Sequence, residues 1–249
     1  MSEPVRSTRA AMLLRSFSVQ ATWNYRTLMG AGFAYVMLPV LRELYGRDRD
    51  RLRDAIARHS GVFNCHPYLV GIAAGAVARL EADGADPRLI DRFKAAVRGS
   101  LGSLGDQLIW AGWRPVCALL ALLLLLVGMP WWVVCGAFLI AYNAGHVAAR
   151  IYSFRLGWAH GMGVAEKLRQ PWVAEVQRRI ATTGAFLLGV LVPLAAGGRT
   201  LALPHPAIAA AVAAVGLLLG LRFGSAVRTP VVLVLVVFVL VGLFVRWWS

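Results

Sequence analysis

The stretch VCALLALLLLLVGMPWWVVCGAFLIAY, residues 116–142, decides the fold. It is apolar, and as a single helix it would be too long for a bilayer, which about 20 residues cross. Gly128 and Pro130 interrupt it near its middle, where glycine weakens a helix and proline removes a backbone hydrogen bond. The stretch predicts two short apolar helices that meet at Gly-Met-Pro, either as a hairpin or as one broken helix. Paired segments of this kind are typical of the binding regions of transporters.

The composition of the whole chain also indicates a membrane protein. Of 249 residues, 59% are hydrophobic and 15% are charged, against about 25% charged residues in an ordinary soluble domain. The mean hydropathy is +0.64. A soluble globule of this size has no single core large enough for so much apolar surface. The composition also excludes a disordered chain and a secreted disulfide scaffold.

Residues 8–115, which precede the apolar stretch, predict amphipathic and short broken helices. Residues 8–22 place apolar side chains on one face, which indicates a helix lying at the membrane interface. Residues 28–41 and 66–80 are apolar but too short to cross a bilayer alone. The highly charged residues 42–59 predict a solvated surface helix.

The rest of the chain divides into three parts. Residues 116–146 form the interrupted apolar hairpin, and residues 147–180 form a basic segment that the positive-inside rule assigns to the cytoplasm. Residues 181–246 predict three transmembrane helices, at roughly 181–197, 206–221 and 229–245. We therefore expect one all-α, polytopic integral membrane domain over residues 1–249, with short broken or re-entrant helices.

The chain is strongly basic, with 26 Lys and Arg against 12 Asp and Glu and a formal net charge of +14. Nucleic-acid binding is one interpretation of such an excess. The arginines, however, are scattered between apolar segments and form no stripe. Cytoplasmic loops that face anionic lipid headgroups explain them better, so we expect a lipid bilayer and no nucleic acid as a partner.

No catalytic motif is present in the sequence. It contains no Walker-type phosphate loop, no nucleophile elbow and no zincin helix. The spacing of Cys65, Cys117 and Cys135 matches no metal or redox pattern, and the five histidines are dispersed. Glycines between residues 99 and 105 imitate a dinucleotide fingerprint, but no strand precedes them. We expect no metal, no cofactor and no catalytic residue in this chain.

Asp106 is the first candidate site residue, since it is the only acid between Asp91 and Glu166 and lies beside the longest apolar region. An acidic side chain at membrane depth is costly and therefore indicates a functional site. Arg114 follows about two helical turns later and is a candidate charge partner. The alternative is that Asp106 caps the following helix while Arg114 meets headgroups.

Amide and aromatic side chains form a second set of candidates. Gln20, Trp23 and Asn24 precede one short apolar stretch, and Asn64 and His66 precede another. Amides form paired hydrogen bonds with hydroxyl groups, and ring faces pack on the C–H face of a sugar, so these residues indicate a sugar site. The alternative is an interfacial aromatic belt and a capped turn.

These residues carry a resemblance to a known family over about residues 14–168. The sequence resembles the IID component of the mannose/fructose/sorbose family of the bacterial phosphoenolpyruvate-dependent sugar phosphotransferase system (PTS). The matching positions are Leu14, Arg15, Ser16, Gln20, Trp23, Asn24, Gly32, Phe33, Pro39, Leu44, Tyr45, Arg58, His59, Phe63, Asn64, Pro67, Gly105, Asp106, Ile109, Trp110, Arg114, Pro115, Arg150, Tyr152, Gly157 and Gly161.

The resemblance implies a multi-pass protein of the bacterial cytoplasmic (inner) membrane. It implies that IID pairs with a IIC subunit in a hetero-oligomer to form the path of a hexose-type sugar, while IIA and IIB proteins carry phosphate on histidines. IID itself has no phosphorylated residue in this family. The implied substrate-binding residues are Gln20, Trp23, Asn24, Arg26, Asn64, His66, Asp106, Trp110 and Arg114.

Several positions depart from the family pattern. Arg26, Thr27 and Leu28 stand where the family has Glu-Arg-Met, and a guanidinium only donates hydrogen bonds where a carboxylate accepts them. Ser100 and Gln107 replace prolines, and Cys65 replaces a threonine. These differences leave a second hypothesis open, in which the chain is a non-transporting membrane scaffold that docks IIA/IIB-type proteins for regulation.

Overall fold

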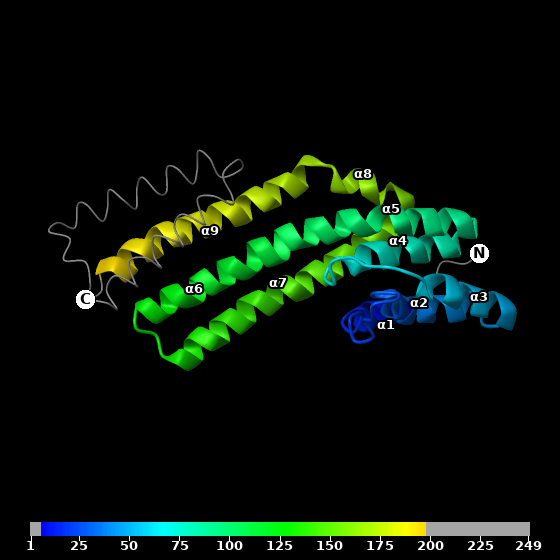
Figure 1. The fold of residues 1–249 in the computed structure, drawn as a ribbon, viewed down its shortest axis with the longest axis horizontal. Coiled ribbons are helices and arrows are strands. Elements are labelled where there is room, and N and C mark those ends of the chain that lie inside the picture. Colours follow the sequence, from blue (N-terminus) through cyan, green and yellow to red (C-terminus); the bar gives the residue numbers. More distant parts are fainter. Residues whose placement is uncertain (1–5, 198–249) are drawn as a thin grey trace. The chain divides into compact units, whose positions relative to one another are not determined.

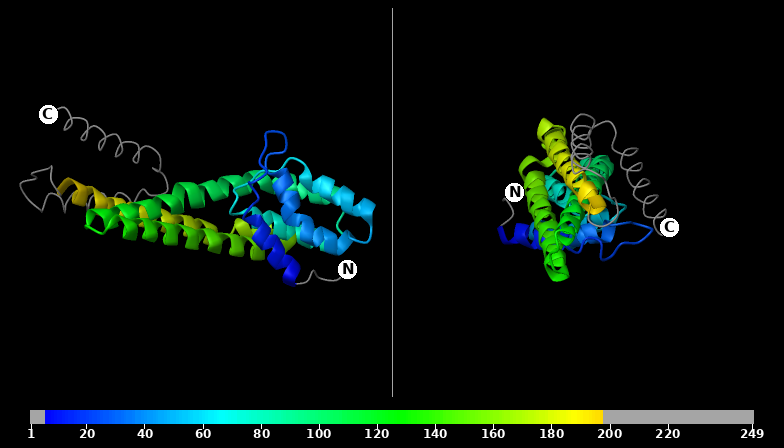
Figure 2. Two further views of the ribbon diagram at one scale, coloured as in Figure 1. Left: turned by 90° about the horizontal axis from the view of Figure 1, so that it is seen from below. Right: turned by 90° about the vertical axis from the view of Figure 1, so that its left-hand side faces the viewer.

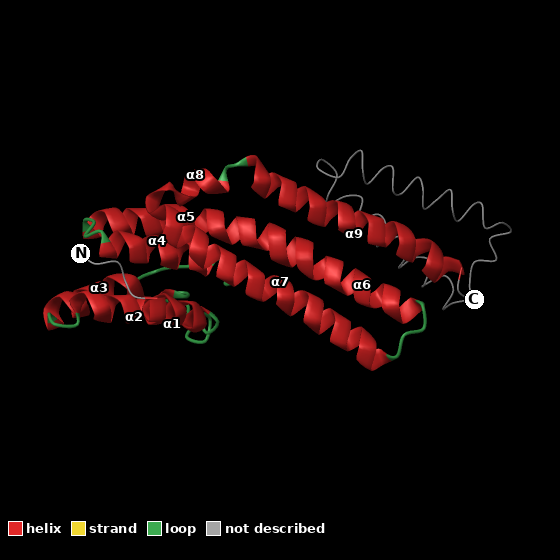
Figure 3. Cartoon of the chain, turned by 180° about the vertical axis from the view of Figure 1, so that it is seen from behind, coloured by secondary structure: helices red, strands yellow, loops and turns green. Residues whose placement is uncertain are grey.

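The computed structural model describes residues 6–197, and these residues fold into helices joined by turns (Figures 1 and 3). The helices are α1 (Arg6–Ser16), α2 (Gly30–Tyr45), α3 (Arg49–Ser60), α4 (Val70–Ala82), α5 (Pro87–Gly105), the π-helix η1 (Asp106–Trp113), α6 (Arg114–Leu126), α7 (Trp131–His160), the 3-10 turn η2 (Gly161–Gly163), α8 (Val164–Leu168) and α9 (Pro171–Gly197). The predicted all-α fold is confirmed for this part of the chain. The predicted spans at 206–221 and 229–245 lie outside the described residues.

The described residues divide into two compact units. The first contains residues 6–114 together with 139–174, and the second contains residues 115–138 and 175–197. The division cuts α7 between Phe138 and Leu139. Each unit has its own packing and is described by itself.

The first unit has a core around α2 and α4. All residues of α4 except Arg79 are buried, which explains why this segment is apolar without an amphipathic pattern. α2 packs between α1, α3 and α4, as two further views in Figure 2 show. Its buried face centres on Phe33, which contacts Phe63 at a ring-centroid distance of 4.3 Å.

Glycines let α4 and α7 approach closely in this unit. A Cβ atom at Gly75 would lie 2.6 Å from the carbonyl oxygen of Phe154 and from the amide nitrogen of Trp158. A Cβ atom at Gly157 would collide with the backbone of Ile72. Close backbone packing of this kind is how helices associate inside membranes, where small residues replace the hydrophobic effect as the basis of packing.

Local signals set the boundaries of the short helices. The side chain of Asp48 accepts a hydrogen bond from the backbone N–H of Arg51 and caps α3. Asp86 does the same for Arg88 at the start of α5, where Pro87 occupies the first helical position. Gly84 lies in the short connection between α4 and α5 and adopts a φ of 71°, which lets the chain turn there.

Within residues 6–197, two helical segments are long and apolar enough to cross a membrane, at Pro87–Leu126 and Trp131–Leu168. The first joins α5, η1 and α6 without interruption, and the π-helix is a rare element that often marks a functional site. α6 ends at Leu126, Gly128 adopts a φ of 88°, and α7 begins at Trp131 after Pro130. The turn therefore lies at Gly-Met-Pro, and the chain forms a hairpin there.

The second unit exposes apolar side chains, as expected of a surface in contact with lipid. Leu125, Trp131 and Trp132 are at least half exposed. In α9, Leu187 and Leu191 are buried, and Gly184 lies in van der Waals range of Val116 on α6. Apolar exposure on this scale is uncommon for a soluble monomer and agrees with an integral membrane protein.

Candidate functional site

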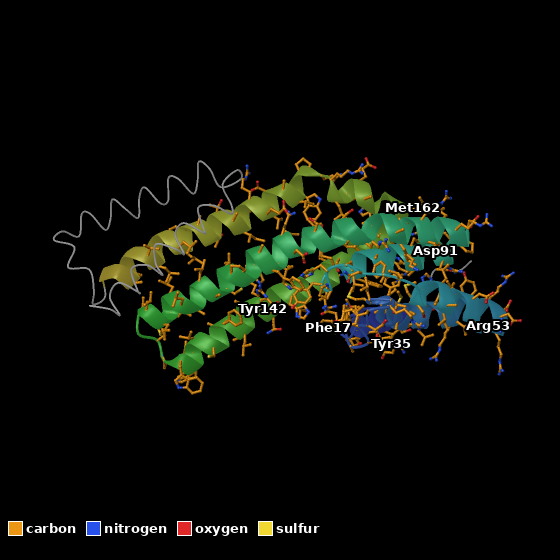
Figure 4. All side chains as sticks on the ribbon, viewed as in Figure 1. Phe17, Tyr35, Arg53, Asp91, Tyr142 and Met162 are labelled. Carbon is orange, nitrogen blue, oxygen red and sulfur yellow. The ribbon has the colours of Figure 1, made fainter. Side chains whose placement is uncertain are left out.

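A group of polar and aromatic side chains, built around the buried His66 and Arg150, lies in the first unit. We call it the His66 cluster. Its members come from four parts of the chain: the end of α1, the segment before α4, the π-helix η1 and the middle of α7. They are Ser16, Phe17, Cys65, His66, Tyr68, Trp110, Tyr142, His146 and Arg150, of which Phe17 and Tyr142 are labelled in Figure 4.

His66 is almost completely buried, with 2% of its surface exposed. Its Nδ1 accepts a hydrogen bond of 3.2 Å from the backbone N–H of Tyr68, which assigns the proton of the neutral ring to Nε2. Nε2 is buried and has no hydrogen-bond partner among the residues that the structure describes. Burial and the neighbouring charges of Arg150 and His146 lower the pKa of His66 to about 4, so the ring is neutral and donates from Nε2.

The position of His66 depends on its neighbours on α5 and η1. Gly105 faces the imidazole so closely that a Cβ atom there would overlap the ring. The indole of Trp110 meets the imidazole edge to face at a centroid distance of 4.9 Å. Trp110 is itself 41% exposed. The imidazole of His66, whose Nε2 is buried, therefore contacts an aromatic ring that reaches the surface of this chain.

Two phenols and an imidazole form the middle of the cluster. The hydroxyl groups of Tyr68 and Tyr142 share a hydrogen bond of 2.8 Å. The ring of His146 stacks on that of Tyr68 at 3.8 Å with an interplanar angle of 16°. His146 Nε2 accepts a hydrogen bond of 2.7 Å from Arg150 Nε. These groups provide both hydrogen-bond donors and hydrogen-bond acceptors, as the binding of a polar ligand requires.

Arg150 closes the cluster toward α1. Its side chain donates to the carbonyl oxygen of Ser16 and lies over the rings of Phe17 and Tyr68, at 4.7 Å and 5.1 Å from their centroids. Only 4% of Arg150 is exposed. Among the described residues, no carboxylate forms an ion pair with it.

The first predicted site motif lies in the connection between α1 and α2. Asn24 builds a tight turn: its side-chain oxygen accepts from the backbone N–H of Arg26 (3.0 Å) and of Thr27 (2.9 Å), and its amide donates to Thr22 O and Thr27 Oγ1. Trp23 packs edge to face with Tyr25 at 4.8 Å. Gln20, Trp23 and Arg26 are exposed on this chain.

Of the other predicted residues, Asn64 follows Phe63, whose backbone forms hydrogen bonds with Thr27 and Met29 beside this turn. Asn64, Asp106 and Arg114 are exposed, and Asp106 forms no ion pair with Arg114 in the described structure. The helix runs through Asp106, so this residue does not cap a helix start as the alternative required. Of the nine predicted residues, the structure brings only His66 and Trp110 into direct ring contact.

The sequence interpretation missed the contribution of α7 to the cluster. Tyr142, His146 and Arg150 follow one another at intervals of four residues in an apolar helix. This spacing places them on one face, and polar side chains on one face of an apolar helix are a signal for an internal site. Arg150 was instead grouped with the solvated basic residues of 147–180, although it is buried.

A second buried polar group holds the helices of the first unit together. Glu81 on α4 accepts hydrogen bonds from Tyr45 (2.7 Å), Arg58 (2.7 Å) and His59 (2.8 Å). Burial alone would raise the pKa of Glu81, but the hydrogen bonds from His59, Arg58 and Tyr45 outweigh it and lower the pKa to about 2. Burial lowers the pKa of His59, and burial together with Glu81 raises the pKa of Tyr45 to about 12. This group ties α2 and α3 to α4.

The helices and the enclosed polar cluster define an all-helical integral membrane protein. Residues 5–202 match the model of the PTS system mannose/fructose/sorbose family IID component, and the chain belongs to this family. The resemblance read from the motifs is thereby confirmed.

Curated relatives support the same assignment. The chain is 29% identical to the fructose permease IID component of Bacillus subtilis, over 73% of this chain and 67% of that protein. It is 31% identical to the sorbose-specific EIID component of Klebsiella pneumoniae, over 73% and 67%. For the mannose-specific EIID component of Escherichia coli the identity is 29%, over 73% and 65%. The chain spans about two thirds of the length of these relatives.

Solved structures share the fold. A structure described as a membrane protein has a TM-score of 0.68 at 26% identity and covers 77% of this chain and 71% of its own. A chain of the mannose transporter ManYZ, solved by cryo-electron microscopy in complex with a microcin, has a TM-score of 0.61 at 23% identity and covers 100% of this chain and 98% of its own. At that identity the second likeness concerns the fold alone.

Proposed function

We propose that this chain is a IID subunit that forms, with a IIC subunit, the path of a hexose-type sugar across the bacterial cytoplasmic membrane. IIA and IIB proteins would supply the phosphate, and this chain would contribute binding groups and no phosphorylated residue. The family match, the names of the relatives and the two long apolar helices support this proposal. The proposed assembly is a hetero-oligomer that crosses the membrane several times.

The observation that carries the proposal is the unpartnered Nε2–H of His66 behind Trp110. A buried donor without a partner costs free energy, about 1–3 kcal/mol, unless a ligand or water satisfies it. A sugar hydroxyl can accept from Nε2, and the C–H face of a sugar can pack against the indole. The hydroxyl groups of Tyr68 and Tyr142 add donor and acceptor capacity nearby.

The remaining predicted residues would line the path where a IIC subunit covers this chain. Gln20, Trp23, Asn24 and Arg26 stand on the connection between α1 and α2. Asn64, Asp106 and Arg114 are the other predicted members, and all three are exposed on the isolated chain. Exposed amides, charges and an indole in an otherwise apolar protein are what a polyhydroxyl solute requires.

Sugar uptake tests the proposal. The chain is expressed with its IIC, IIA and IIB proteins in cells that lack other mannose-family transporters, and uptake of labelled mannose, fructose and sorbose is measured. His66→Gln keeps an N–H donor and should retain uptake, whereas His66→Leu should lower it by about tenfold or more because the donor is lost. Trp131→Phe, at an exposed tryptophan outside the cluster, is the control. Equal uptake in His66→Leu and the control would contradict the proposed site, and no uptake of any sugar would contradict the transport function.

A further inference from the structure

Arg150 is placed at the C-terminal end of a helix that belongs to a distant part of the sequence. α1 ends at Ser16, and the last carbonyl groups of a helix need partners from outside it. The carbonyl oxygen of Ser16 accepts one hydrogen bond from the backbone N–H of Val19, at 3.3 Å. Arg150 on α7 donates to the carbonyl oxygen of Ser16, and its NH1 also lies 3.4 Å from the hydroxyl oxygen of Ser16. One side chain of α7 therefore caps α1.

The surroundings of Arg150 compensate its charge without a carboxylate. The C-terminal end of a helix carries partial negative charge, which stabilises a cation there. The rings of Phe17 and Tyr68 present their faces to the guanidinium. His146 Nε2 accepts a further hydrogen bond and, stacked on Tyr68, joins Arg150 to the rest of the His66 cluster.

The cap lies where the connection of residues 17–28 begins. This connection is ordered along its length: a Cβ atom at Gly32 would collide with the backbone of Val19, and Leu28, at a φ of 57°, bridges to Asn24 and Phe63. Arg150 holds the first end through Ser16 and Phe17. Between the two ends stand the exposed residues Trp23 and Arg26 and the half-buried Asn24, all three proposed for the sugar path.

We propose that Arg150 is a positioning residue for the connection of residues 17–28. By capping α1 from α7, it fixes where this connection leaves α1 and ties its placement to the His66 cluster. Arg150 itself is buried and contacts no sugar in this proposal. An effect of Arg150 on sugar binding rests on the proposed function. The ordering of residues 17–28 by Arg150 does not depend on it.

Hydrogen–deuterium exchange on the complex with IIC in detergent tests the ordering directly. Arg150→Met removes the charge and the donors, and amides of residues 17–28 should then exchange about tenfold faster or more, while peptides of α3 stay at the wild-type rate. Arg150→Lys keeps a cation at the helix end and should restore part of the protection. Arg155→Met, at an exposed arginine on the same helix, is the control and should match the wild type.

Sugar uptake provides the second measurement. In Arg150→Met the half-saturating sugar concentration should rise by about tenfold while the maximal rate stays within about twofold, since binding groups are misplaced and no transport step is removed. Unchanged exchange in residues 17–28, or an equal increase in α3, would overturn the proposal. Should Arg150→Met fail to assemble, Phe17→Leu removes only the ring contact and must still raise exchange in residues 17–28. If the wild type takes up no sugar, the transport function is refuted. The exchange measurement alone then tests whether Arg150 positions residues 17–28.

Discussion

Gly105 on α5 faces the imidazole of His66 so closely that no side chain fits between them. The same imidazole meets Trp110, five residues further along the continuous helix that α5 forms with η1. The absence of a side chain at residue 105 thus lets the buried donor of His66 lie against the π-helix. The relationship explains why a glycine stands immediately before Asp106, inside a long helix where it weakens the backbone.

Gly105→Ala should displace His66 and destabilise the first unit. Overpacking of a filled interior costs about 1–3 kcal/mol. Gly102→Ala is the matched control, because nothing lies within 4 Å of a Cβ atom at that position of the same helix. Thermal unfolding in detergent, followed by near-ultraviolet circular dichroism, should show a lower midpoint for Gly105→Ala alone. Equal midpoints for the two variants would contradict the packing described for His66.

Glu81 is the acceptor on which three donors converge, so its removal should cost more than the removal of an exposed acid. Breaking a buried ion pair on one side typically costs about 3–5 kcal/mol, because the remaining charge stays buried. Glu81→Gln should therefore destabilise the first unit strongly. Asp83, two residues after Glu81, carries a half-exposed carboxylate that pairs with Arg79, and Asp83→Asn should have little effect. The readout is the unfolding midpoint in detergent, and similar values for the two variants would refute the structural role of Glu81.

The group around Glu81 should also make the first unit sensitive to acid. Burial lowers the pKa of His59 below its ordinary value of 6.5, so its contribution to stability is present above pH 6.5 and is lost as the pH falls below that value. The pKa of Glu81 is lowered from 4.5 to about 2, so its contribution is present above pH 4.5 and is lost between pH 4.5 and about 2. We expect the unfolding midpoint to decrease below pH 6.5. In His59→Gln the decrease between pH 6.5 and 4.5 should be smaller but not absent, because the lowered pKa of His66 acts over the same range. An unchanged profile would contradict the assignment.

The fold could be predicted from the sequence where local chemistry decides it. Gly128 and Pro130 gave the turn between two apolar helices, because one residue adopts a positive φ and the other cannot continue a helix. Asp86 and Pro87, an N-cap residue followed by a proline, are likewise residue types with which a helix begins. The single unbroken course of α5, η1 and α6 was not predictable in this way, since glycines at 99, 102 and 105 weaken a helix.

The candidate site was predictable only in part, because its members come from distant segments. His66 and Trp110 were identified from their residue types and motifs, and they meet in the structure. The capping of α1 by Arg150 could not be read from the sequence, because it joins residues that are 134 positions apart. Buried charge and surface charge look alike in a sequence, whereas in the structure the exposed fraction separates Arg150 from Arg155.

Asp106 should matter for transport more than for assembly. It is exposed on η1 of this chain and forms no ion pair there, so a charge at this position has no structural partner to lose. A hydrogen bond from a sugar or from a facing backbone to a carboxylate is worth about 1.5–3 kcal/mol, or roughly one to two decades in affinity. Asp106→Asn should therefore raise the half-saturating sugar concentration by that factor, with unchanged co-purification of IIC. Normal uptake in this variant would remove Asp106 from the site.

Arg26 provides the sharpest test of substrate choice. It lies exposed on the turn built by Asn24, in a position where the family has a carboxylate, so it replaces an acceptor of sugar hydroxyls by a donor. Arg26→Glu should restore the acceptor and increase binding of ordinary hexoses, measured by uptake competition between mannose, fructose and sorbose. Arg26→Gln, which offers a neutral acceptor and donor, should give an intermediate result. In a chain that only docks regulatory proteins, neither substitution would change sugar binding. If Arg26→Glu and Asp106→Asn both leave uptake unaltered, the exposed residues contribute structure alone, and the sugar site is confined to the His66 cluster.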